Sequence, residues 1–214
     1  MSTGQPAGPR FRVVPGSLEV FTAAAGCRSW TELAGAASCC VACPELAASR
    51  TTVVVGDAPV GARLALVGEA PGAEEDRSGR PFVGRAGRLL DGLLAENGLD
   101  RGTVAVVNVL QCRPPGNRPP TAAEAARCRG WLERKLELLA PELVVSLGLS
   151  AAVSFLGRGV RLGAVRGTVH EVRGRRILPT YHPSAAIRFG PAGAPLAGLR
   201  ADLALAATLL TGPT

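Results

Sequence analysis

Cysteines are the first residues in this sequence whose types and spacing could do chemistry. Cys40 and Cys43 form a C-x2-C pair, Cys112 begins a proline-rich loop, and Cys128 lies in the helix predicted after that loop. Four thiolates that converge suit either a structural zinc ion or an iron–sulfur cluster, and the spacing alone does not choose between them. Unrelated buried thiols are the simpler alternative, although the C-x2-C pair favours a metal site.

Two further cysteines affect the choice of ligands. Cys39 is adjacent to Cys40 and could take its place, whereas Cys27 lies in a predicted helix and is expected to be buried. Disulfides are rare in the cytosol, where we expect this protein to be. The cysteine pattern therefore predicts a metal site with one ambiguous ligand.

A carboxylate in a glycine-rich turn is the second candidate for chemistry. The apolar run Leu64 to Val67 has the character of a buried strand, and Gly68-Glu69-Ala70-Pro71-Gly72 follows it directly. An open α/β sheet binds its ligand where such a strand ends. The turn lacks the G-x-G-x-x-G spacing, and the chain has no P-loop Gly-Lys-Ser/Thr, so we expect no nucleotide cofactor.

The elements that must position these residues alternate between strands and helices. Apolar runs at Leu64–Val67, Val104–Val107 and Leu143–Leu147 predict buried parallel strands, and Arg173-Gly174 predicts the turn of a hairpin. We expect an α/β fold with three layers, α/β/α, around a central, mainly parallel four-stranded sheet. Helices are expected at Ser17–Ala37, Gly84–Asn97, Thr121–Leu139, Ser150–Leu156 and Leu196–Leu210. Residues 1–15 are expected to form a flexible tail and residues 16–214 a single domain.

Composition limits the choice of partner. The formal net charge is +7 and the pI about 9.8, and the basic residues are all arginine except Lys135. Arginine side chains pair well with phosphate groups, but a genome whose base composition favours arginine over lysine would give the same composition. No apolar run approaches the ~20 residues that cross a bilayer, and the first ten residues have no signal-peptide character. We therefore expect a cytoplasmic protein without a membrane partner.

Three motifs in order resemble those of the family 4 uracil-DNA glycosylases. The first comprises Gly68-Glu69-Ala70-Pro71-Gly72, Glu75-Asp76 and Gly79-Arg80-Pro81-Phe82-Val83-Gly84. The middle one comprises Asn108-Val109 and Cys112-Arg113-Pro114-Pro115-Gly116-Asn117-Arg118, and the last is Tyr181-His182-Pro183-Ser184. The resemblance extends from about Cys40 to the final helix. It implies a monofunctional glycosylase that flips uracil out of DNA and a [4Fe–4S] cluster on Cys40, Cys43, Cys112 and Cys128.

The resemblance also implies roles for individual residues. Glu69 would orient or deprotonate the attacking water, and His182 would donate to uracil O2 as uracil leaves. Phe82 would stack on the flipped base, and Asn108 would read uracil O4 and N3–H. Each of these residues also has a simpler interpretation. Glu69 could be a solvated carboxylate in a turn, and His182 a structural histidine. Phe82 could be a core residue, and Asn108 the cap of a turn. His170 is expected to be structural.

The remaining implied contacts surround the base and the DNA backbone. The residues implied to bind the base are Gly68, Ala70, Glu75, Phe82, Asn108 and His182, with Glu75 and the backbone near Ala70 close to uracil C5. The residues implied to contact DNA are Arg113, Arg118, Ser184, Ile187 and Arg188, with Ile187 as the wedge into the gap.

Two expectations concern turnover and the alternative function. Some relatives in the wider superfamily trap uracil-DNA through a histidine after the middle motif, but Arg113 to Pro120 contains none. We therefore expect turnover, by a monomer whose partner is uracil-containing DNA. The alternative is a non-catalytic iron–sulfur DNA-binding protein, which would not need Glu69, Asn108 and His182 in three separate loops.

Overall fold

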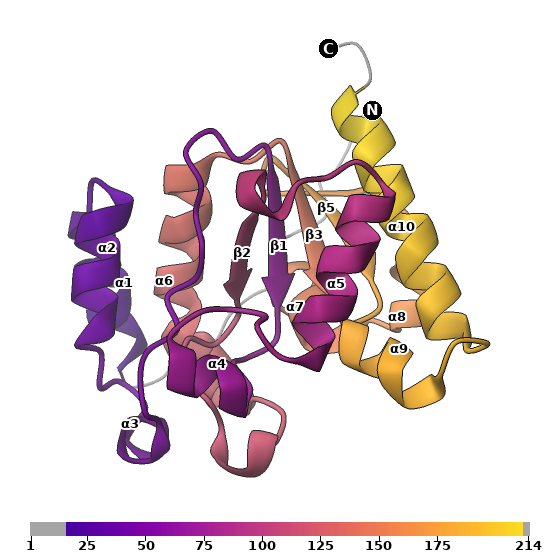
Figure 1. Cartoon of the computed structure of the whole chain (residues 1–214). Coiled ribbons are helices and arrows are strands. Elements are labelled where there is room, and N and C mark those ends of the chain that lie inside the picture. Colours follow the sequence, from indigo (N-terminus) through magenta and orange to yellow (C-terminus); the bar gives the residue numbers. More distant parts are fainter. Residues whose placement is uncertain (1–15, 212–214) are drawn as a thin grey trace.

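The computed structural model describes residues 16–211, so the predicted tail, residues 1–15, and residues 212–214 lie outside the described part of the chain. A central sheet has the strand order β2-β1-β3-β5-β4, with helices on both faces (Figure 1). This arrangement confirms the predicted three-layer α/β/α fold with a mainly parallel sheet.

Each strand corresponds to a segment that the sequence indicated. The strands are β1 (Leu64–Gly68), β2 (Ala105–Asn108), β3 (Leu143–Leu147), β4 (His170–Val172) and β5 (Arg175–Thr180). The first three are buried along their whole length, which is why they are continuously apolar. β4 pairs antiparallel with β5 through the predicted Arg173-Gly174 turn. The sheet thus has five strands rather than the predicted four, because both strands of this hairpin join it.

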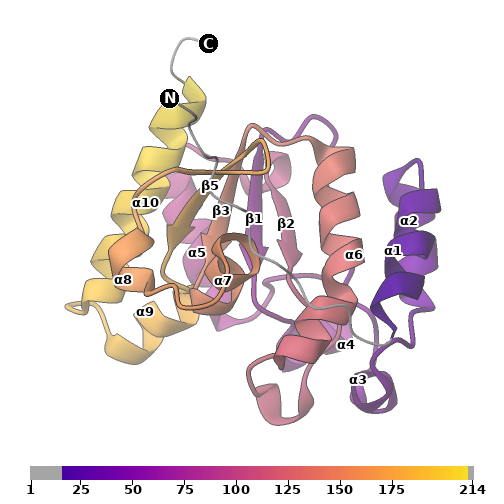
Figure 2. The same ribbon diagram turned by 180° about the vertical axis from the view of Figure 1, so that it is seen from behind.

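Alternate residues of the strands face two separate cores. Leu64, Leu66 and their in-phase neighbours pack against α5 (Arg85–Glu96) and α10 (Ala194–Thr211). Ala65, Val67 and their neighbours pack against α6 (Ala122–Leu139) and α7 (Leu149–Leu156), which cover the other face in Figure 2. The period of two along each strand sends successive side chains to opposite layers.

The predicted helix Ser17–Ala37 is two helices. α1 (Ser17–Gly26) ends before Cys27, and α2 (Trp30–Ser38) begins after Ser29, whose hydroxyl accepts from Glu32 N–H at 3.2 Å. Both pack against α6 outside the sheet (Figures 1 and 2). Because both helices bury the same kind of apolar stripe, the periodicity did not indicate the break.

Short helices gather near the carboxyl ends of β1 and β2, at the lower edge of Figure 1. They are α3 (Pro44–Ser49), α4 (Ala73–Ser78), α8 (Leu162–Val165), α9 (Pro183–Phe189) and the 3₁₀ turn η2 (Pro115–Asn117). A second 3₁₀ turn, η1 (Arg101–Thr103), precedes β2. The predicted capping box of α6 is confirmed: Thr121 Oγ1 accepts from Glu124 N–H, and Glu124 accepts from Thr121 N–H.

α10 is long and apolar enough, by length and composition, to cross a membrane. Its buried residues Leu199, Leu203, Ala206 and Leu210 nevertheless belong to the core between α5 and the sheet. An apolar face of this kind is expected of a helix that forms one layer of an α/β/α fold. α10 therefore serves as a core layer here.

Candidate active site and cysteine cluster

The predicted site residues lie at the carboxyl ends of three strands of the sheet, β1, β2 and β5. Gly68 ends β1 and Glu69 follows it, Asn108 ends β2, and His182 follows β5. The chain leaves β1 for β2 on one side and later enters β3 on the other, so a crevice is expected outside these strand ends. Residues far apart in the sequence are thus brought to one edge of the sheet.

Asn108 and Phe82 meet over the backbone of Gly68. A Cβ atom on Gly68 would lie 2.3 Å from Asn108 Oδ1 and 2.6 Å from Phe82 Cζ, so only glycine fits there. Asn108 is 3% exposed, and its Oδ1 has no hydrogen-bond partner within the described chain. A buried acceptor without a partner is costly unless a ligand supplies the donor.

Phe82 is held in a backbone conformation that bulky residues avoid. Its φ is +53°, in the left-handed region, and its side chain is 7% exposed. The centroid of its ring lies 5.7 Å from that of the His182 ring, with the two planes tilted by 35°. Aromatic groups from the first and last motifs are therefore neighbours.

Hydrogen bonds fix the tautomer of His182. The backbone N–H of Ser184 donates to His182 Nδ1 at 3.1 Å, and Ser184 Oγ lies 2.8 Å from the same nitrogen. Because a backbone N–H can only donate, Nδ1 is the acceptor, and the ring proton of the neutral imidazole is on Nε2. Burial lowers the His182 pKa to about 4, against the opposing effect of the Glu75 charge, so the ring is neutral at pH 7 and Nε2–H is a donor.

Glu69 is held from two sides. Its Oε2 accepts a hydrogen bond from Ser150 Oγ at 2.5 Å, and its backbone carbonyl accepts from Leu110 N–H at 3.0 Å. Ser150 lies in the first turn of α7, after the tight turn at Gly148. The carboxylate of Glu69 therefore has a fixed orientation between β1 and α7.

Glu75, expected near uracil C5, accepts hydrogen bonds from three backbone N–H groups. Its Oε1 accepts from Val83 N–H at 3.0 Å and from Gly84 N–H at 2.9 Å, and its Oε2 accepts from Gly72 N–H at 3.0 Å. These contacts join the start of α4 to the segment that carries Phe82. The geometry gives Glu75 a positioning role, and Ala70 is half-buried beside the same turn.

The predicted DNA contacts are distributed over two segments. Arg113 Nε donates to Asn117 Oδ1 at 2.7 Å, and both lie in the proline-rich loop. Arg118 pairs with Glu124 at 2.7 Å and with Glu45 at 3.2 Å, so its guanidinium anchors this loop to α6 and α3. In α9, Ser184 and Arg188 are exposed and Ile187 is half-buried.

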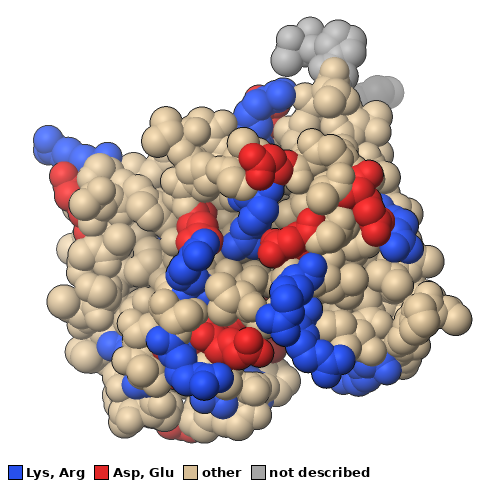
Figure 3. Space-filling view, in the orientation of Figure 1, with Lys and Arg blue, Asp and Glu red and all other residues tan. Residues whose placement is uncertain are grey.

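A band of basic side chains crosses the face shown in Figure 3, over α5 and α9. The exposed arginines of these two helices are Arg85, Arg88 and Arg188. α5 and α9 are in contact, so these cations border the strand ends that carry the site. Arg85 and Arg88 were not singled out from the sequence, because arginines are spread along the whole chain.

The four predicted metal-ligating cysteines line one cavity. Cys40 and Cys43 come from the segment before α3, Cys112 from the loop after β2, and Cys128 from α6. Cys39 is exposed and Cys27 donates to Ala23 O at 3.3 Å, and neither lines the cavity. In the described part of the chain, no three Cys, His, Asp or Glu side chains form a group that could hold a metal ion.

The donor set of this cavity nevertheless fits a cluster. Burial raises the pKa of Cys43 to about 11 and of Cys128 to about 12, so thiolates there need a metal or cations to stabilise them. Arg50 donates to Cys112 Sγ at 3.2 Å. Trp131 Nε1 is buried without a hydrogen-bond acceptor among the described residues and lines the same cavity, where a cluster sulfur would accept from it.

Lys135 is fully buried beside this region. Its ammonium donates to the carbonyl of Val55, and burial lowers its pKa to about 7, an effect that the neighbouring Cys128 and Cys112 oppose. The lysine amine thus lies near the thiols and is inaccessible to solvent.

The sequence from residue 55 to residue 203 matches the uracil DNA glycosylase superfamily, so the chain belongs to that superfamily. It is 46% identical over 151 residues to the type-4 uracil-DNA glycosylase of Thermotoga maritima, an alignment that covers 70% of this chain and 78% of that protein. It is 40% identical over 151 residues to the type-4 enzyme of Archaeoglobus fulgidus, covering 67% and 76%. These similarities confirm the resemblance to the type-4 enzymes. A type-5 uracil-DNA glycosylase of Pyrobaculum aerophilum is 31% identical over 178 residues, covering 68% and 78%.

Proposed function

We propose that the protein is a monofunctional uracil-DNA glycosylase that flips uracil out of DNA and hydrolyses the bond between uracil N1 and deoxyribose C1′. One observation carries the proposal. The side chains assigned to base recognition, Phe82, Asn108 and His182, lie at the strand ends where the carboxylate of Glu69 is held in place. The reaction would begin base excision repair in the cytoplasm. The similar proteins are uracil-DNA glycosylases, which supports DNA as the substrate.

Base reading is assigned to Asn108. Its unpartnered Oδ1 would accept from uracil N3–H while its amide nitrogen donates to O4. Cytosine presents an acceptor at N3 and an amine at C4, so the same amide would face two mismatched groups. The backbone at Gly68 and Ala70 would border C5, where thymine carries its methyl group.

Bond cleavage places charge of both signs in the site. Uracil leaves with negative charge on N1 and O2, which the Nε2–H of neutral His182 would stabilise. The sugar becomes positive at C1′, where Glu69 would orient a water. The water oxygen bonds to C1′ as the bond to N1 breaks, and the water proton passes to the Glu69 carboxylate. Phe82 would stack on the extruded base.

DNA contact is assigned to Arg113, Ser184 and Arg188, with Ile187 as the wedge. The exposed Arg85 and Arg88 extend the basic surface beside them (Figure 3). A DNA contact for Arg118 stays a prediction, since its ion pairs hold the loop on which Arg113 lies. Phosphate contacts of this kind position the duplex without reading its sequence.

The cofactor assigned to the cysteine cavity is a [4Fe–4S] cluster on Cys40, Cys43, Cys112 and Cys128. When bound, it would cross-link the segment before α3, the loop after β2, and α6. Cys128→Ser should remove iron and visible absorption from the purified protein, whereas Cys39→Ser should retain both. A colourless, iron-free protein with full activity would overturn this assignment.

The monofunctional assignment rests on Lys135. Strand cleavage after base removal proceeds through an amine, of a lysine or of the N-terminus, that forms a Schiff base with the opened sugar. The only lysine of the chain is buried and donates to Val55 O. Borohydride should therefore trap no covalent complex with uracil-containing DNA. We also propose that the protein acts as a monomer without a nucleotide cofactor.

Cleavage of a labelled oligonucleotide with one uracil tests the function. A break is expected only after alkali treatment and only for uracil, with cytosine and thymine oligonucleotides as controls. Glu69→Gln and His182→Ala should each lower the single-turnover rate by about 10²–10⁴-fold. A brown protein that binds DNA but breaks no strand would favour the alternative, a non-catalytic iron–sulfur DNA-binding protein.

A further inference from the structure

The backbone of Phe82 needs support from outside its own segment. A bulky residue at φ +53° is strained, and this strain persists only where neighbouring contacts hold it. Gly87 shows how closely the segment is packed, since a Cβ atom there would lie 1.7 Å from Phe82 O. Side chains from other segments bind the peptide groups on either side of Phe82.

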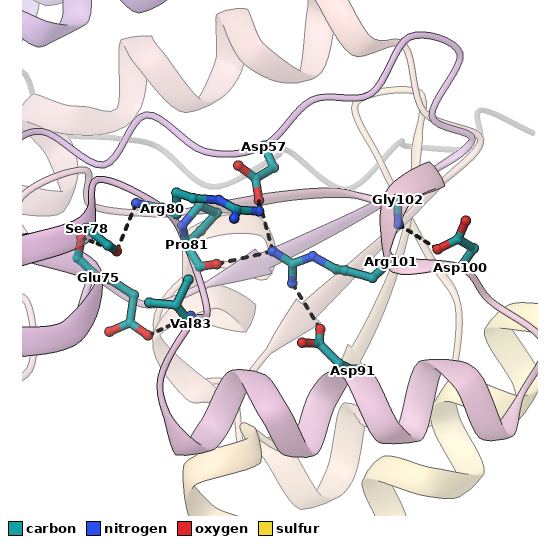
Figure 4. Close-up of polar contacts among 10 residues, drawn as sticks. All are labelled: Asp57, Glu75, Ser78, Arg80, Pro81, Val83, Asp91, Asp100, Arg101 and Gly102. Carbon is teal, nitrogen blue, oxygen red and sulfur yellow. Dashed lines mark hydrogen bonds and ion pairs between the residues drawn. The ribbon is translucent and has the colours of Figure 1, made fainter.

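The peptide groups after Phe82 are held by a carboxylate, and the one before it is held by a guanidinium. Glu75 accepts from Val83 N–H and Gly84 N–H, as described above. Arg101 Nη2 donates to the carbonyl of Pro81 at 3.1 Å. Figure 4 shows Glu75 and Arg101 on opposite sides of this short segment.

Arg101 is itself fixed by two carboxylates. Its Nη2 also donates to Asp57 Oδ2 at 3.1 Å, and its Nη1 lies 3.5 Å from Asp91 Oδ1 in α5 (Figure 4). Asp57 is tied to β2, because its N–H and carbonyl bond with the backbone of Val106 at 2.9 and 2.8 Å. Arg101 therefore links the Phe82 segment to the strand that ends in Asn108.

We propose that Arg101 is a positioning residue that sets the distance between Phe82 and Asn108, and so the width of the space for the flipped base. The inference rests on the proposed stacking role of Phe82. A planar guanidinium can donate to Pro81 O and to two carboxylates from fixed directions, which the single ammonium of lysine cannot reproduce. Arg101 lies outside the three motifs, and its side chain is 23% exposed, with both terminal guanidinium nitrogens engaged by Pro81 O, Asp57 and Asp91.

The test separates base binding from DNA binding. Arg101→Ala should weaken inhibition by free uracil about tenfold and slow single-turnover cleavage to a similar extent. Affinity for the abasic product DNA should stay within about twofold, because no phosphate contact is lost. Arg101→Lys should recover part of the loss. Arg200→Ala is the matched control, since Arg200 forms an exposed ion pair with Glu96 away from the Phe82 segment.

Asp57→Asn provides a second variant in case Arg101→Ala fails to fold. It should weaken uracil inhibition in the same direction, and the double variant should lose less than the sum of the two single losses. Uracil inhibition in Arg101→Ala and Asp57→Asn equal to that of Arg200→Ala would overturn the inference.

Phe82→Ala distinguishes this inference from the proposed function. If Phe82→Ala weakens uracil inhibition but Arg101→Ala does not, the positioning role of Arg101 fails and the function stands. If Phe82→Ala leaves uracil inhibition unchanged, the stacking role fails and the inference with it. A wild-type protein that cleaves no uracil-containing DNA overturns both.

Discussion

The hydroxyl of Ser150 donates to Oε2 of Glu69 across 2.5 Å and so joins the first turn of α7 to the turn after β1. The two residues are 81 positions apart, and Ser150 lies outside the three motifs. A carboxylate held in this way keeps one orientation, which a water-positioning residue needs.

Ser150→Ala should slow single-turnover cleavage about tenfold, because Glu69 loses the donor that orients it. Ser150→Thr keeps the hydroxyl and should recover most of the rate. Ser154→Ala is a matched control in the same helix, since Ser154 Oγ donates to Ala151 O. Equal rates for Ser150→Ala and Ser154→Ala would contradict the role.

His182 should stay neutral far below the usual histidine range, because burial lowers its pKa to about 4. With only two histidines in the chain, the imidazole signals can be followed by NMR and assigned with a His170→Gln variant. The His182 signals should move only as the pH approaches about 4. Since the unfolded chain takes up this proton at about 6.5, stability should fall as the pH drops from about 6.5 to about 4. Titration of His182 near 6.5 would contradict this account.

Gly68→Ala should abolish most activity without unfolding the protein. The new methyl would collide with Asn108 Oδ1 and Phe82 Cζ and displace both from the strand end. Gly35→Ala in α2 is the control, because a Cβ atom there has no atom within 4 Å among the described residues. Thermal unfolding checks that both variants fold, and uracil cleavage should fall only in Gly68→Ala.

The proline-rich loop should detach in acid as Glu124 is protonated. The hydrogen bonds that Glu124 accepts from Arg118 lower the Glu124 pKa to about 2. The N–H of Thr121 contributes to this lowering, and burial opposes it. The stability from this lowered pKa is present above the ordinary value of 4.5 and is lost as the pH falls toward about 2. Melting temperatures of wild type and Glu124→Gln should converge over that range. Glu137→Gln, in an exposed pair with Arg134, should shift the melting temperature little at any pH.

Local chemistry explains why much of the fold could be predicted. β1, β2 and β3 are continuously apolar because they are buried on both faces, and the Thr121–Glu124 capping box needs only four residues. α4 could not be predicted from its acidic residues, since its Asp76 accepts from Thr51 N–H, far away in sequence. The break between α1 and α2 has a local signal that periodicity misses, since Ser29 caps α2 and accepts from Glu32 N–H.

The sequence motifs predict four residues of the candidate site, and tertiary contacts add Ser150 and Arg101 as supporting residues. Glu69, Phe82, Asn108 and His182 belong to motifs, and the fold brings all four to the same edge of the sheet. Ser150 and Arg101 belong to none, because their roles arise from partners 81 and 20 residues away. Glu75 was expected beside the base, but its backbone acceptor role depends on where Val83 and Gly84 lie.

The burial of Lys135 has a practical consequence for labelling. Amine-reactive dyes and cross-linkers find no lysine ammonium on the described surface, since the chain has this one lysine and its side chain is enclosed. The cations that face solvent are guanidinium groups, which such reagents leave unmodified. An amine-coupled fluorophore is therefore expected on the N-terminal α-amino group, so DNA-binding measurements with it should report on guanidinium charges that the label has not altered.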